Sequence, residues 1–380
     1  MNTRIALVLA TLALVACAET VSTAPQSALA LSSAPDADRA PGAVYTLTNQ
    51  ANGNGVAIFD RTPDGVLSYS ATVPTGGLGT GAGLSSQGAV VLSDDNRHLL
   101  AVNAGSNDIS LFAVTQDGLT LVQRIASGGV RPVSVAIRKG IVYALNAGGT
   151  GNIAGFSLGA NGRLSPIAGS SRPLSSANAG AAQISFAPDG RALVVTERFT
   201  NAIDVYSLDA DGVAGSAQVH ASSGATPFGF DFTRQGTLVV SEAFGGAPDG
   251  SAASSYVVRD GQLSLVTGSL GTTETAACWV VVSKDGKYAY TANAGSSSIT
   301  GYGIERDGGL RLLDADGVTG STGAGAGALD LAVSGNGRFL YVLTNRANAV
   351  AGFRIGENGS LEPVTVGNGL PAGAVGLAAR

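Results

Sequence analysis

Glu197 and Arg198 are adjacent and oppositely charged, and they interrupt the mainly apolar stretch LVVTERFTNAIDVYSL at residues 193–208. Such a pair is conspicuous because only 13% of the residues in the chain are charged. A glutamate with a raised pKa can act as a general base near neutral pH, and a guanidinium can hold a substrate carboxylate or an oxyanion. The pair is therefore a candidate catalytic site, with a solvated charged turn as the alternative.

The pair lies within a unit that repeats along the chain. Its clearest copies read AQISFAPDGRALVVTERFTNAIDVYSLDADG, CWVVVSKDGKYAYTANAGSSSITGYGIERDG and LDLAVSGNGRFLYVLTNRANAVAGFRIGENG. Each copy predicts a strand, a tight turn, an aromatic-rich strand, a polar turn and a third strand, and a fourth strand follows. Asp-Gly and Asn-Gly supply the positive φ angles of hairpin turns. Four strands in roughly 45 residues are typical of a propeller blade.

The number of copies predicts the whole architecture. Further copies begin near Gly88, Arg131 and Thr226, and a first copy at Gly42 brings the total to seven. The first copy lacks its first strand, and the C-terminal GAVGLAAR resembles that missing strand. We therefore expect an all-β, seven-bladed β-propeller of four-stranded antiparallel blades over residues 42–380, with the ring closed by the C-terminal strand.

One position, at the end of the second strand, carries a polar residue in five blades. Aligned on the turn glycine, its occupants are Asn103, Asn146, Glu197, Glu242 and Asn293. Asparagine caps tight turns with its own side chain, which gives the asparagines a structural alternative. Glutamate is a poor turn residue, so Glu197 and Glu242 are the stronger candidates for function. Asn293 is kept as a candidate for ligand binding.

A second position begins the inner strands, and we expect it to face the same mouth of the channel. Its occupants include Ser134, Gln183, Gly229, Trp279 and Asp330. We expect Gln183, Trp279 and Asp330 to bind ligand, with Trp279 stacking on a ring; inter-blade packing is the alternative for Trp279. The sequence thus predicts that Glu197, Glu242, Gln183, Arg198 and Trp279 line one pocket.

Composition limits the partners and cofactors. With 22 Lys and Arg against 27 Asp and Glu, and no basic run, nucleic acid is excluded as a partner. The only histidines, His98 and His220, match no channel position, so neither a histidine zinc site nor a Ser-His-Asp triad is expected. No spaced calcium loop is present. We expect no cofactor, no metal and a monomer.

The N-terminus, MNTRIALVLATLALVACAET, predicts export. Residues 1–17 resemble a lipoprotein signal peptide, in which Cys17 would be lipidated; an ordinary signal peptide cleaved near Ala30 is the alternative. Residues 18–41, rich in Ala, Ser, Thr and Pro, predict a flexible linker. The expected location is the cell envelope, as an outer-membrane lipoprotein that faces the periplasm or the surface and contacts the membrane only through its N-terminus.

The repeats resemble those of the seven-bladed β-propeller lactonases, a family that includes 6-phosphogluconolactonase and carboxymuconate cyclase. The motifs PDGRALVVTE and GNGRFLYVLTNRANAVAGF also resemble the YVTN-type repeats of non-enzymatic surface propellers. In lactonases, the stretch that matches residues 180–183 often reads Gly-Pro-Arg-His, and the resemblance implies chemistry by this histidine with a nearby Glu and Arg. Here Gln183 replaces the histidine, whereas Glu197 and Arg198 are retained.

Two functions fit these observations. The first is an exported, lipid-anchored propeller that binds a small molecule, glycan or protein at the channel mouth. The alternative is a lactonase-like hydrolase of a sugar or muconate-type lactone. In that enzyme Glu197 would be the general base, Arg198 would hold the oxyanion, and Gln183 would position substrate or water.

Overall fold

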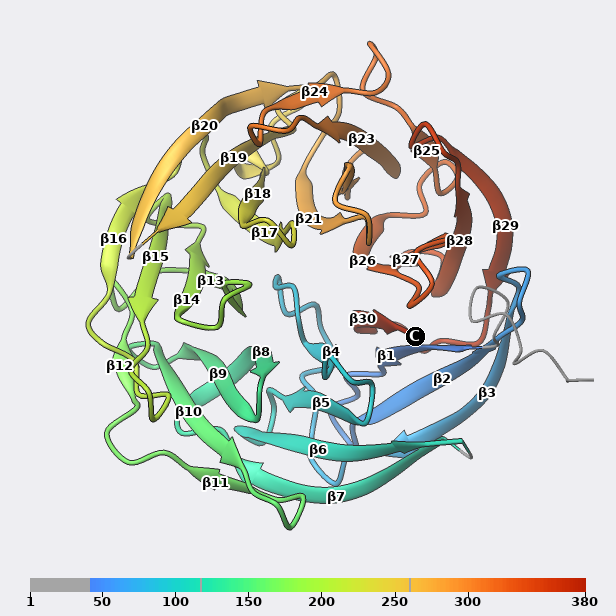
Figure 1. The fold of residues 1–380 in the computed structure, drawn as a ribbon. Coiled ribbons are helices and arrows are strands. Elements are labelled where there is room, and N and C mark those ends of the chain that lie inside the picture. Colours follow the sequence, from blue (N-terminus) through green and yellow to red (C-terminus); the bar gives the residue numbers. More distant parts are fainter. Residues whose placement is uncertain (1–41, 117, 260) are drawn as a thin grey trace, which may run out of the picture. The chain divides into compact units, whose positions relative to one another are not determined.

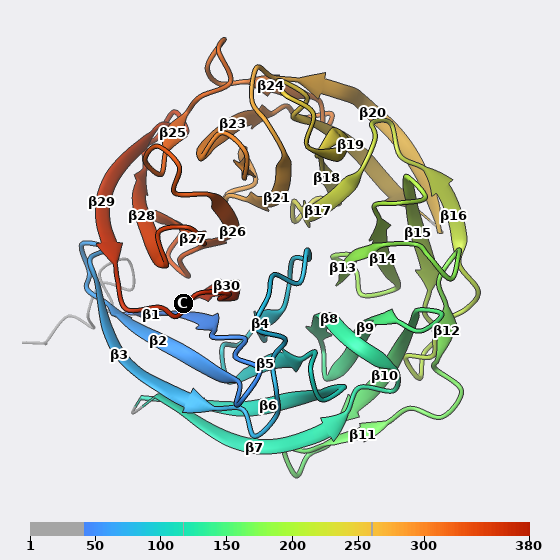
Figure 2. The ribbon, with the colours of Figure 1, turned by 180° about the vertical axis from the view of Figure 1, so that it is seen from behind.

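The structure, a computed structural model, describes residues 42–116, 118–259 and 261–380. These residues form seven antiparallel sheets arranged as the blades of a ring (Figures 1 and 2). The prediction of an all-β, seven-bladed propeller is confirmed. The predicted signal peptide, its Cys17 and the predicted linker lie outside the described residues. None of the described helical segments has the length and apolar character needed to cross a bilayer.

Each blade has an inner, a second, a third and an outer strand. The inner strands are β30 (Val375–Ala379), β4 (Val90–Leu92), β8 (Val130–Arg138), β13 (Ala181–Phe186), β17 (Pro227–Phe232), β21 (Ala277–Val282) and β26 (Ala328–Val333). The second strands are β1 (Gly42–Leu47), β5 (His98–Asn103), β9 (Ile141–Gly148), β14 (Ala192–Glu197), β18 (Thr237–Glu242), β22 (Tyr288–Asn293) and β27 (Phe339–Thr344).

The third and outer strands complete the blades. The third strands are β2 (Gly55–Arg61), β6 (Asp108–Thr115), β10 (Asn152–Leu158), β15 (Ala202–Ser207), β19 (Ala252–Arg259), β23 (Ser298–Ile304) and β28 (Ala349–Ile355). The outer strands are β3 (Leu67–Pro74), β7 (Gly118–Ala126), β11 (Leu164–Pro166) with β12 (Arg172–Pro173), β16 (Gln218–Ala221), β20 (Gln262–Gly271), β24 (Leu310–Leu312) with β25 (Gly320–Ser321), and β29 (Leu361–Gly367). Within the described residues, one 3-10 turn, η2 (Phe244–Gly246), follows β18.

The antiparallel order of the strands gives the ring two distinct sides. On the connection side, the inner strands begin and the second strands end. On the turn side, short turns join the inner strand to the second strand in every blade except the first, whose strands β30 and β1 are far apart in the sequence. Glycines at φ of 75°, 74° and 73° in three of these turns, Gly190, Gly286 and Gly337, adopt the backbone that the Asp-Gly and Asn-Gly signals predict.

The first blade is completed by the end of the chain. Strand β30 pairs antiparallel with β1, with Val44 opposite Ala379 and Tyr45 opposite Ala378. The expectation that the C-terminal strand closes the ring is therefore confirmed. This pairing gives β1 a partner on its inner edge, which would otherwise expose unpaired backbone groups.

Neighbouring blades are joined by a repeated contact between a tyrosine and a glycine. Tyr143, Tyr290 and Tyr341 lie on second strands and are fully buried, and their hydroxyls donate to the carbonyl oxygens of Gly212, Gly359 and Gly65 in the next blade, at 2.7, 3.0 and 2.9 Å. A Cβ at Gly65 would lie 2.4 Å from the Phe339 ring, so this turn needs glycine. Each contact satisfies a buried hydroxyl and fixes the spacing of two blades.

Deletion of residues 372–380 should destabilise the ring strongly. The deletion removes β30, in which Val375 and Leu377 are buried, and leaves the first blade with three strands. We expect the free energy of unfolding to fall by ~3–6 kcal/mol from the lost burial of these two side chains alone. Urea denaturation would measure this fall, with deletion of residues 18–40 as the control. Equal midpoints for the two deletions would contradict the closure of the ring by β30.

Candidate functional site

The Glu197 side chain is fully buried at the end of β14 and faces its own blade. Its Oε1 atom accepts a hydrogen bond of 2.9 Å from the backbone N–H of Ser175. Its Oε2 atom accepts from the hydroxyls of Ser175 and Thr200, the latter at 2.6 Å. The carboxylate therefore ties the loop that leads into the blade to the turn that follows β14.

Glu242 has the same role in the next blade and is also fully buried. Its carboxylate accepts from the N–H of Gly224 at 2.7 Å and from the hydroxyls of Ser254 and Ser269, both at 2.5 Å. Ser254 lies on the third strand and Ser269 on the outer strand. The longer glutamate side chain thus links three strands of one blade.

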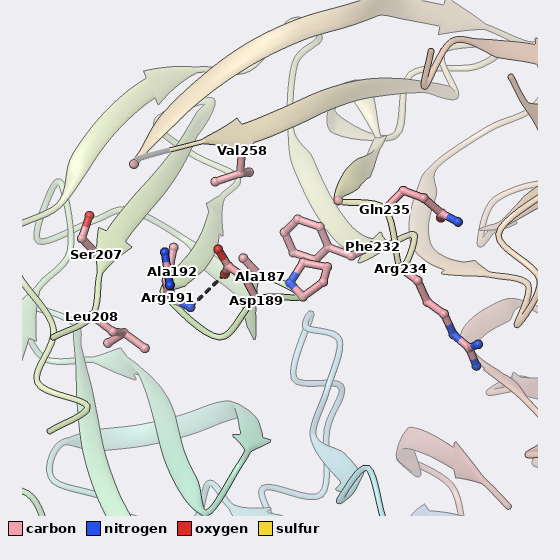
Figure 3. Close-up of a pocket in the computed structure, with 13 residues that line it drawn as sticks. Ala187, Asp189, Arg191, Ala192, Ser207, Leu208, Phe232, Arg234, Gln235 and Val258 are labelled. Carbon is pink, nitrogen blue, oxygen red and sulfur yellow. Dashed lines mark hydrogen bonds between the residues drawn. The ribbon is translucent and has the colours of Figure 1, made fainter. Parts of the chain in front are cut away.

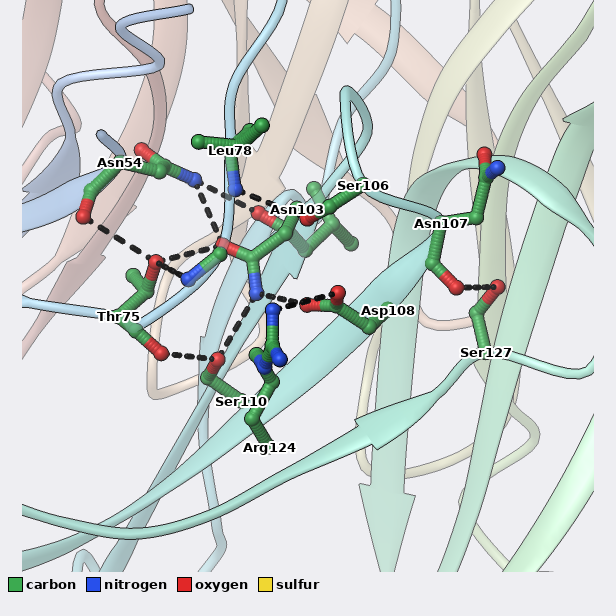
Figure 4. A network of polar contacts seen from close by, with 12 residues as sticks. Asn54, Thr75, Leu78, Asn103, Ser106, Asn107, Asp108, Ser110, Arg124 and Ser127 are labelled. Atoms are coloured by element: carbon green, nitrogen blue, oxygen red, sulfur yellow. Dashed lines mark hydrogen bonds and ion pairs between the residues drawn. The ribbon is translucent and has the colours of Figure 1, made fainter. Parts of the chain in front are cut away.

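The asparagines at this position make equivalent contacts with shorter reach. Asn103 Nδ2 donates to Asp108 Oδ1 at 2.6 Å and to Ser110 Oγ at 2.8 Å, while its Oδ1 accepts from Thr75 at 2.7 Å (Figure 4). Asn293 donates to two hydroxyls on β23, at 3.0 and 2.9 Å. Position by position, glutamate and asparagine therefore serve the same structural purpose in the blades.

A second buried carboxyl lies beside Glu197. Burial, the charge of Glu197 and a hydrogen bond with Glu197 raise the pKa of Asp204 to about 8. The Tyr206 hydroxyl lies 3.3 Å from Asp204 Oδ2. Asp204 is fully buried on β15 and is therefore protonated at neutral pH, which spares this blade a pair of unscreened negative charges.

Gln183 links two inner strands across the gap between their blades. Its Nε2 donates to the carbonyl of Phe230 at 2.9 Å, and its Oε1 accepts from the N–H of Phe230 at 2.7 Å. Asp330 acts in the same way, because its Oδ2 accepts from the N–H of Gly376 at 2.9 Å. Burial raises the pKa of Asp330 to about 7.

A segment at Ser86 and Gln87 crosses the channel. Gln87 holds Val280 of β21 through hydrogen bonds of 2.7 and 3.0 Å, as Gln183 holds Phe230. The chain around β4 reaches towards the middle of the ring in both views (Figures 1 and 2). A Cβ at Gly229 would lie 2.1 Å from Gln87 Oε1, so Gln87 occupies the space that a side chain at this position would fill.

Trp279 is held by the same segment. Its indole Nε1 donates to the carbonyl of Ser86 at 2.9 Å, and its ring centroid lies 5.0 Å from that of Phe228. Ser86 in turn donates to the carbonyl of Val133 at 2.8 Å. Only 6% of Trp279 is exposed, so it packs between blades rather than presenting an open face.

Arg198 is the predicted site residue that lies at the surface of the connection side. Its Nε donates to the carbonyl of Gly180 at 3.0 Å, and its guanidinium carbon lies 4.9 Å and 5.4 Å from the ring centroids of Phe199 and Phe228. Its two terminal nitrogens have no hydrogen-bond partner among the described residues. The guanidinium is therefore oriented by protein contacts and keeps donors for a ligand.

Arg198 lines a recess of about 180 Å³ together with Arg131, Asn178 and Phe199. Arg131 has φ of 54°, and its N–H donates to Asn107 Oδ1 at 2.8 Å, which holds this unusual backbone. The side chain of Phe199 is an open apolar surface, since 62% of the residue is exposed. The recess therefore combines two cations and one aromatic face.

The nearby thiol does not add a nucleophile to this recess. Burial raises the pKa of Cys278 to about 12, although the charge of Arg198 lowers it. The thiol therefore stays neutral near pH 7. Within the described ranges, no group of three His, Cys, Asp or Glu side chains could hold a metal ion.

The structure does not bring the five predicted residues into one pocket. Glu197 and Glu242 are enclosed within their blades, and Trp279 is buried against Phe228. Arg198 lines the connection-side recess, whereas Gln183 lines a separate cavity on the turn side. The prediction of a shared pocket is wrong because a strand-end side chain can turn into its own blade as readily as towards the channel.

Asp231 is a candidate that the sequence analysis missed. It lines the turn-side cavity of about 730 Å³, and its carboxylate accepts from the N–H groups of Val282 and Phe232, both at 2.8 Å. Burial raises its pKa. The signal was a lone acid in the aromatic strand PFGFDF.

A groove of about 490 Å³ between the fourth and fifth blades also lies on the turn side. Arg191 and Arg234 line it, and Arg234 extends away from Arg191 (Figure 3). The N–H of Arg191 donates to Asp189 Oδ1 at 2.9 Å. Arginines thus stand on both sides of Phe232 at this edge of the ring.

The sequence matches the model of a family described as "Lactonase, 7-bladed beta-propeller" over residues 44–169, 150–244 and 281–368. The chain is similar in structure to a periplasmic gluconolactonase from Pseudomonas aeruginosa, with 15% identity, 88% of this chain and 99% of that chain covered, and a TM-score of 0.68. It is also similar to a candidate 6-phosphogluconolactonase from Bacteroides fragilis, with 18% identity, coverage of 90% and 99%, and a TM-score of 0.68. A search of curated proteins found no match.

The buried Asp204 should make the protein less stable as the pH rises. Its pKa of about 8 in the folded state exceeds its ordinary value of 3.8, so between these values the folded protein retains a proton that the unfolded chain releases. Stability should therefore fall from about pH 4 to about pH 8, and then stay level with respect to this group. Asp204→Asn should reduce that fall.

Urea midpoints measured at pH 5 and pH 8 would test this expectation. The control is Asp211→Asn, an exposed acid in the following turn. An equal loss of stability between the two pH values in the wild type and in Asp204→Asn would show that Asp204 does not carry the proton.

Proposed function

Since the chain belongs to the family of seven-bladed β-propeller lactonases, we propose that it hydrolyses a lactone that carries a carboxylate or phosphate group. The observation that carries this proposal is the connection-side recess with Arg131 and Arg198. Two cations beside one aromatic face suit a ring that bears an anionic substituent. The recess is small, so the substrate would be a single ring rather than an oligosaccharide.

Arg198 would stabilise the oxyanion that forms when water adds to the lactone carbonyl. Its Nε is fixed by Gly180 and its plane by Phe199 and Phe228, so its terminal N–H groups are directed before the substrate arrives. Oriented donors need no reorganisation as charge develops. Arg131 would hold the anionic substituent, and Phe199 would contact the apolar face of the ring.

No carboxylate or histidine is among the residues that line this recess. The buried Glu197 accepts three hydrogen bonds inside its blade, which argues against the expectation that it acts as the general base. The proposed catalysis therefore relies on stabilisation of the oxyanion, without a protein base. Water adds to the carbonyl carbon and releases a proton to solvent. The bond from this carbon to the ring oxygen then breaks, and the ring oxygen takes a proton from solvent. A lactone is an activated ester, for which this is sufficient chemistry.

Arg198→Ala should lower kcat/KM for 6-phosphogluconolactone by about 10²–10³-fold, the usual cost of one lost oxyanion donor. Ring opening by the purified full-length protein would be followed by acid release, with the uncatalysed rate subtracted. The exposed Arg306→Ala is the control for loss of one positive charge.

Between pH 5 and pH 7, kcat/KM should show no fall towards acid, because no protein base must be deprotonated.

The variant Glu197→Gln distinguishes hydrolysis by oxyanion stabilisation alone from hydrolysis with Glu197 as general base. Under the present proposal this variant melts at a lower temperature but keeps its kcat/KM. A folded Glu197→Gln variant without turnover would instead identify Glu197 as the base.

Ligand binding without catalysis is the second candidate function. The absence of a base among the residues that line the recess favours it. Under this alternative the same recess would bind an anionic small molecule or glycan, or a protein that presents an acidic group. Binding of gluconate that Arg198→Ala weakens, together with no turnover of any lactone, would support it over hydrolysis.

We also propose that the protein acts as a monomer in the cell envelope, anchored through a lipid on Cys17. The support for the lipid anchor is the N-terminal sequence, with an apolar run that ends in LVAC. An acylated cysteine with more than one chain anchors a protein stably. Cys17→Ser should move the protein from the detergent-extracted membrane fraction into the soluble fraction, or leave it unprocessed, as judged by immunoblotting. Wild-type protein that is wholly soluble would contradict the anchor.

A further inference from the structure

The turn-side cavity lies outside the site assigned to the lactone. It has a volume of about 730 Å³, within the range of small-molecule sites, and it is lined from the blades around the ring. Asn96, Pro188, Arg234, Lys284 and Gly335 reach it from five different turns. The cavity is therefore the turn-side mouth of the channel, at the opposite end from Arg198.

The crossing segment separates the two ends of the channel. Ser86 and Gln87 hydrogen-bond to inner strands on different sides of the ring, through Val133, Ala182 and Val280. Gly88, which follows this segment, lines the turn-side cavity, whereas Leu84, which precedes it, lines the connection-side recess. A ligand in the turn-side cavity would thus meet Gly88 and Gln183 at its inner end and could not pass to Arg198.

The turns around the turn-side mouth of the channel are basic although the chain is acidic overall. The turns that join inner to second strands, counted together with Arg138 at the end of β8, lie at residues 93–97, 138–140, 187–191, 233–236, 283–287 and 334–338. In these turns Lys and Arg outnumber Asp and Glu by eight to four, whereas the whole chain has 22 basic and 27 acidic residues. Positive charge is therefore concentrated around one mouth, where it attracts anions.

Two of the cations that line the cavity are unpaired. Arg234 and Lys284 are exposed and form no hydrogen bond or ion pair with any described residue. Arg138, in contrast, lies 3.6 Å from Asp94 and donates to the carbonyl of Pro188. The free charges are thus those of Arg234 and Lys284, which lie on the turns of neighbouring blades.

The acid in the cavity does not cancel these charges fully. Asp231 already accepts two backbone hydrogen bonds, and burial raises its pKa, although these hydrogen bonds and the nearby charge of Lys284 act in the opposite direction. The Ser185 hydroxyl also lines the cavity and has no hydrogen-bond partner among the described residues. Apart from the Arg138–Asp94 ion pair and the hydroxyls that already make hydrogen bonds, the wall therefore offers two cations, one hydroxyl and one carboxyl to a ligand that carries oxygen atoms.

We propose that the turn-side cavity is a second binding site, which takes a small multivalent anion with carboxylate or phosphate groups. Arg234 and Lys284 bind its charged groups, and Ser185 donates to one of its oxygens. The site is independent of the lactone site, because the crossing segment lies between them.

Isothermal titration of the full-length protein with 6-phosphogluconate and with inorganic phosphate would test this site. Glucose serves as the neutral probe. The variant is Arg234→Ala/Lys284→Ala, which should bind 6-phosphogluconate at least about tenfold more weakly, since it loses two charge-assisted contacts. The control is Arg259→Ala/Arg306→Ala, which removes the same charge from exposed positions that line none of the described cavities. Binding to the wild type should also weaken as salt is added.

The connection-side recess could also bind these anions, so every titration is repeated in the Arg198→Ala background. The proposal requires that binding persists in Arg198→Ala, is lost on addition of Arg234→Ala/Lys284→Ala, and is kept on addition of the control pair. Binding that Arg198→Ala alone abolishes, equal losses in the two double variants, or glucose binding as tight as that of the anions would overturn it. None of these outcomes depends on lactone turnover, so failure of the second site is distinguishable from failure of the proposed activity.

Discussion

The inner strands of the ring have no strand neighbour on their channel-facing edges, and this constraint shapes the centre of the molecule. Buried N–H and C=O groups must find partners. Here the partners are side chains from the neighbouring blade or from the crossing segment. In four cases a side-chain oxygen accepts a hydrogen bond from a backbone N–H of an inner strand. The pairs are Gln183 with Phe230, Asp231 with Val282, Asp330 with Gly376, and Gln87 with Val280. The polar residues of the channel therefore hold the blades together first, and only those with spare donors remain for ligands.

The same need for hydrogen-bond partners explains the polar residues at the ends of the second strands. A third strand leaves from this point, and a loop from the previous blade arrives there. Hydroxyl groups converge at these junctions. Glu197, Glu242 and Asn103 accept hydrogen bonds from them, whereas Asn293 donates to the hydroxyl of Ser298. Carboxylate and amide side chains therefore both tie together the segments that meet at these junctions.

The architecture could be read from the sequence because its signals are local and repeated. Turn dipeptides, strand alternation and the missing first strand of the opening repeat predict seven blades and the closure by β30. The candidate functional site could be predicted from the sequence only in part. Arg198 lines a surface recess, but the direction of Glu197 depends on Ser175, which belongs to a connecting loop.

The role of Gln87 could not be predicted from the sequence for a related reason. It lies outside the repeat pattern and acts on a strand 193 residues away. The need for glycine at position 229 is explained only by the structure, in which Gln87 occupies the space that a side chain there would fill. A side chain that crosses the ring, such as Gln87, leaves no periodic pattern in the sequence. Where such a side chain supplies the hydrogen bonds, the inner strand needs no polar residue of its own at the equivalent position.

The pairing of β1 with β30 has a consequence for the order in which the molecule can be made. Thr46 and Val375, which meet across this pair, are 329 residues apart. At ribosomal rates of about 5–20 residues per second, roughly 16–66 s separate the synthesis of the two partners. Throughout that interval the first blade lacks its inner strand and cannot be completed by any other segment of the nascent chain. A ribosome that stalls late would thus release an open ring with a free strand edge, a substrate for chaperones and proteases rather than a slightly shortened protein.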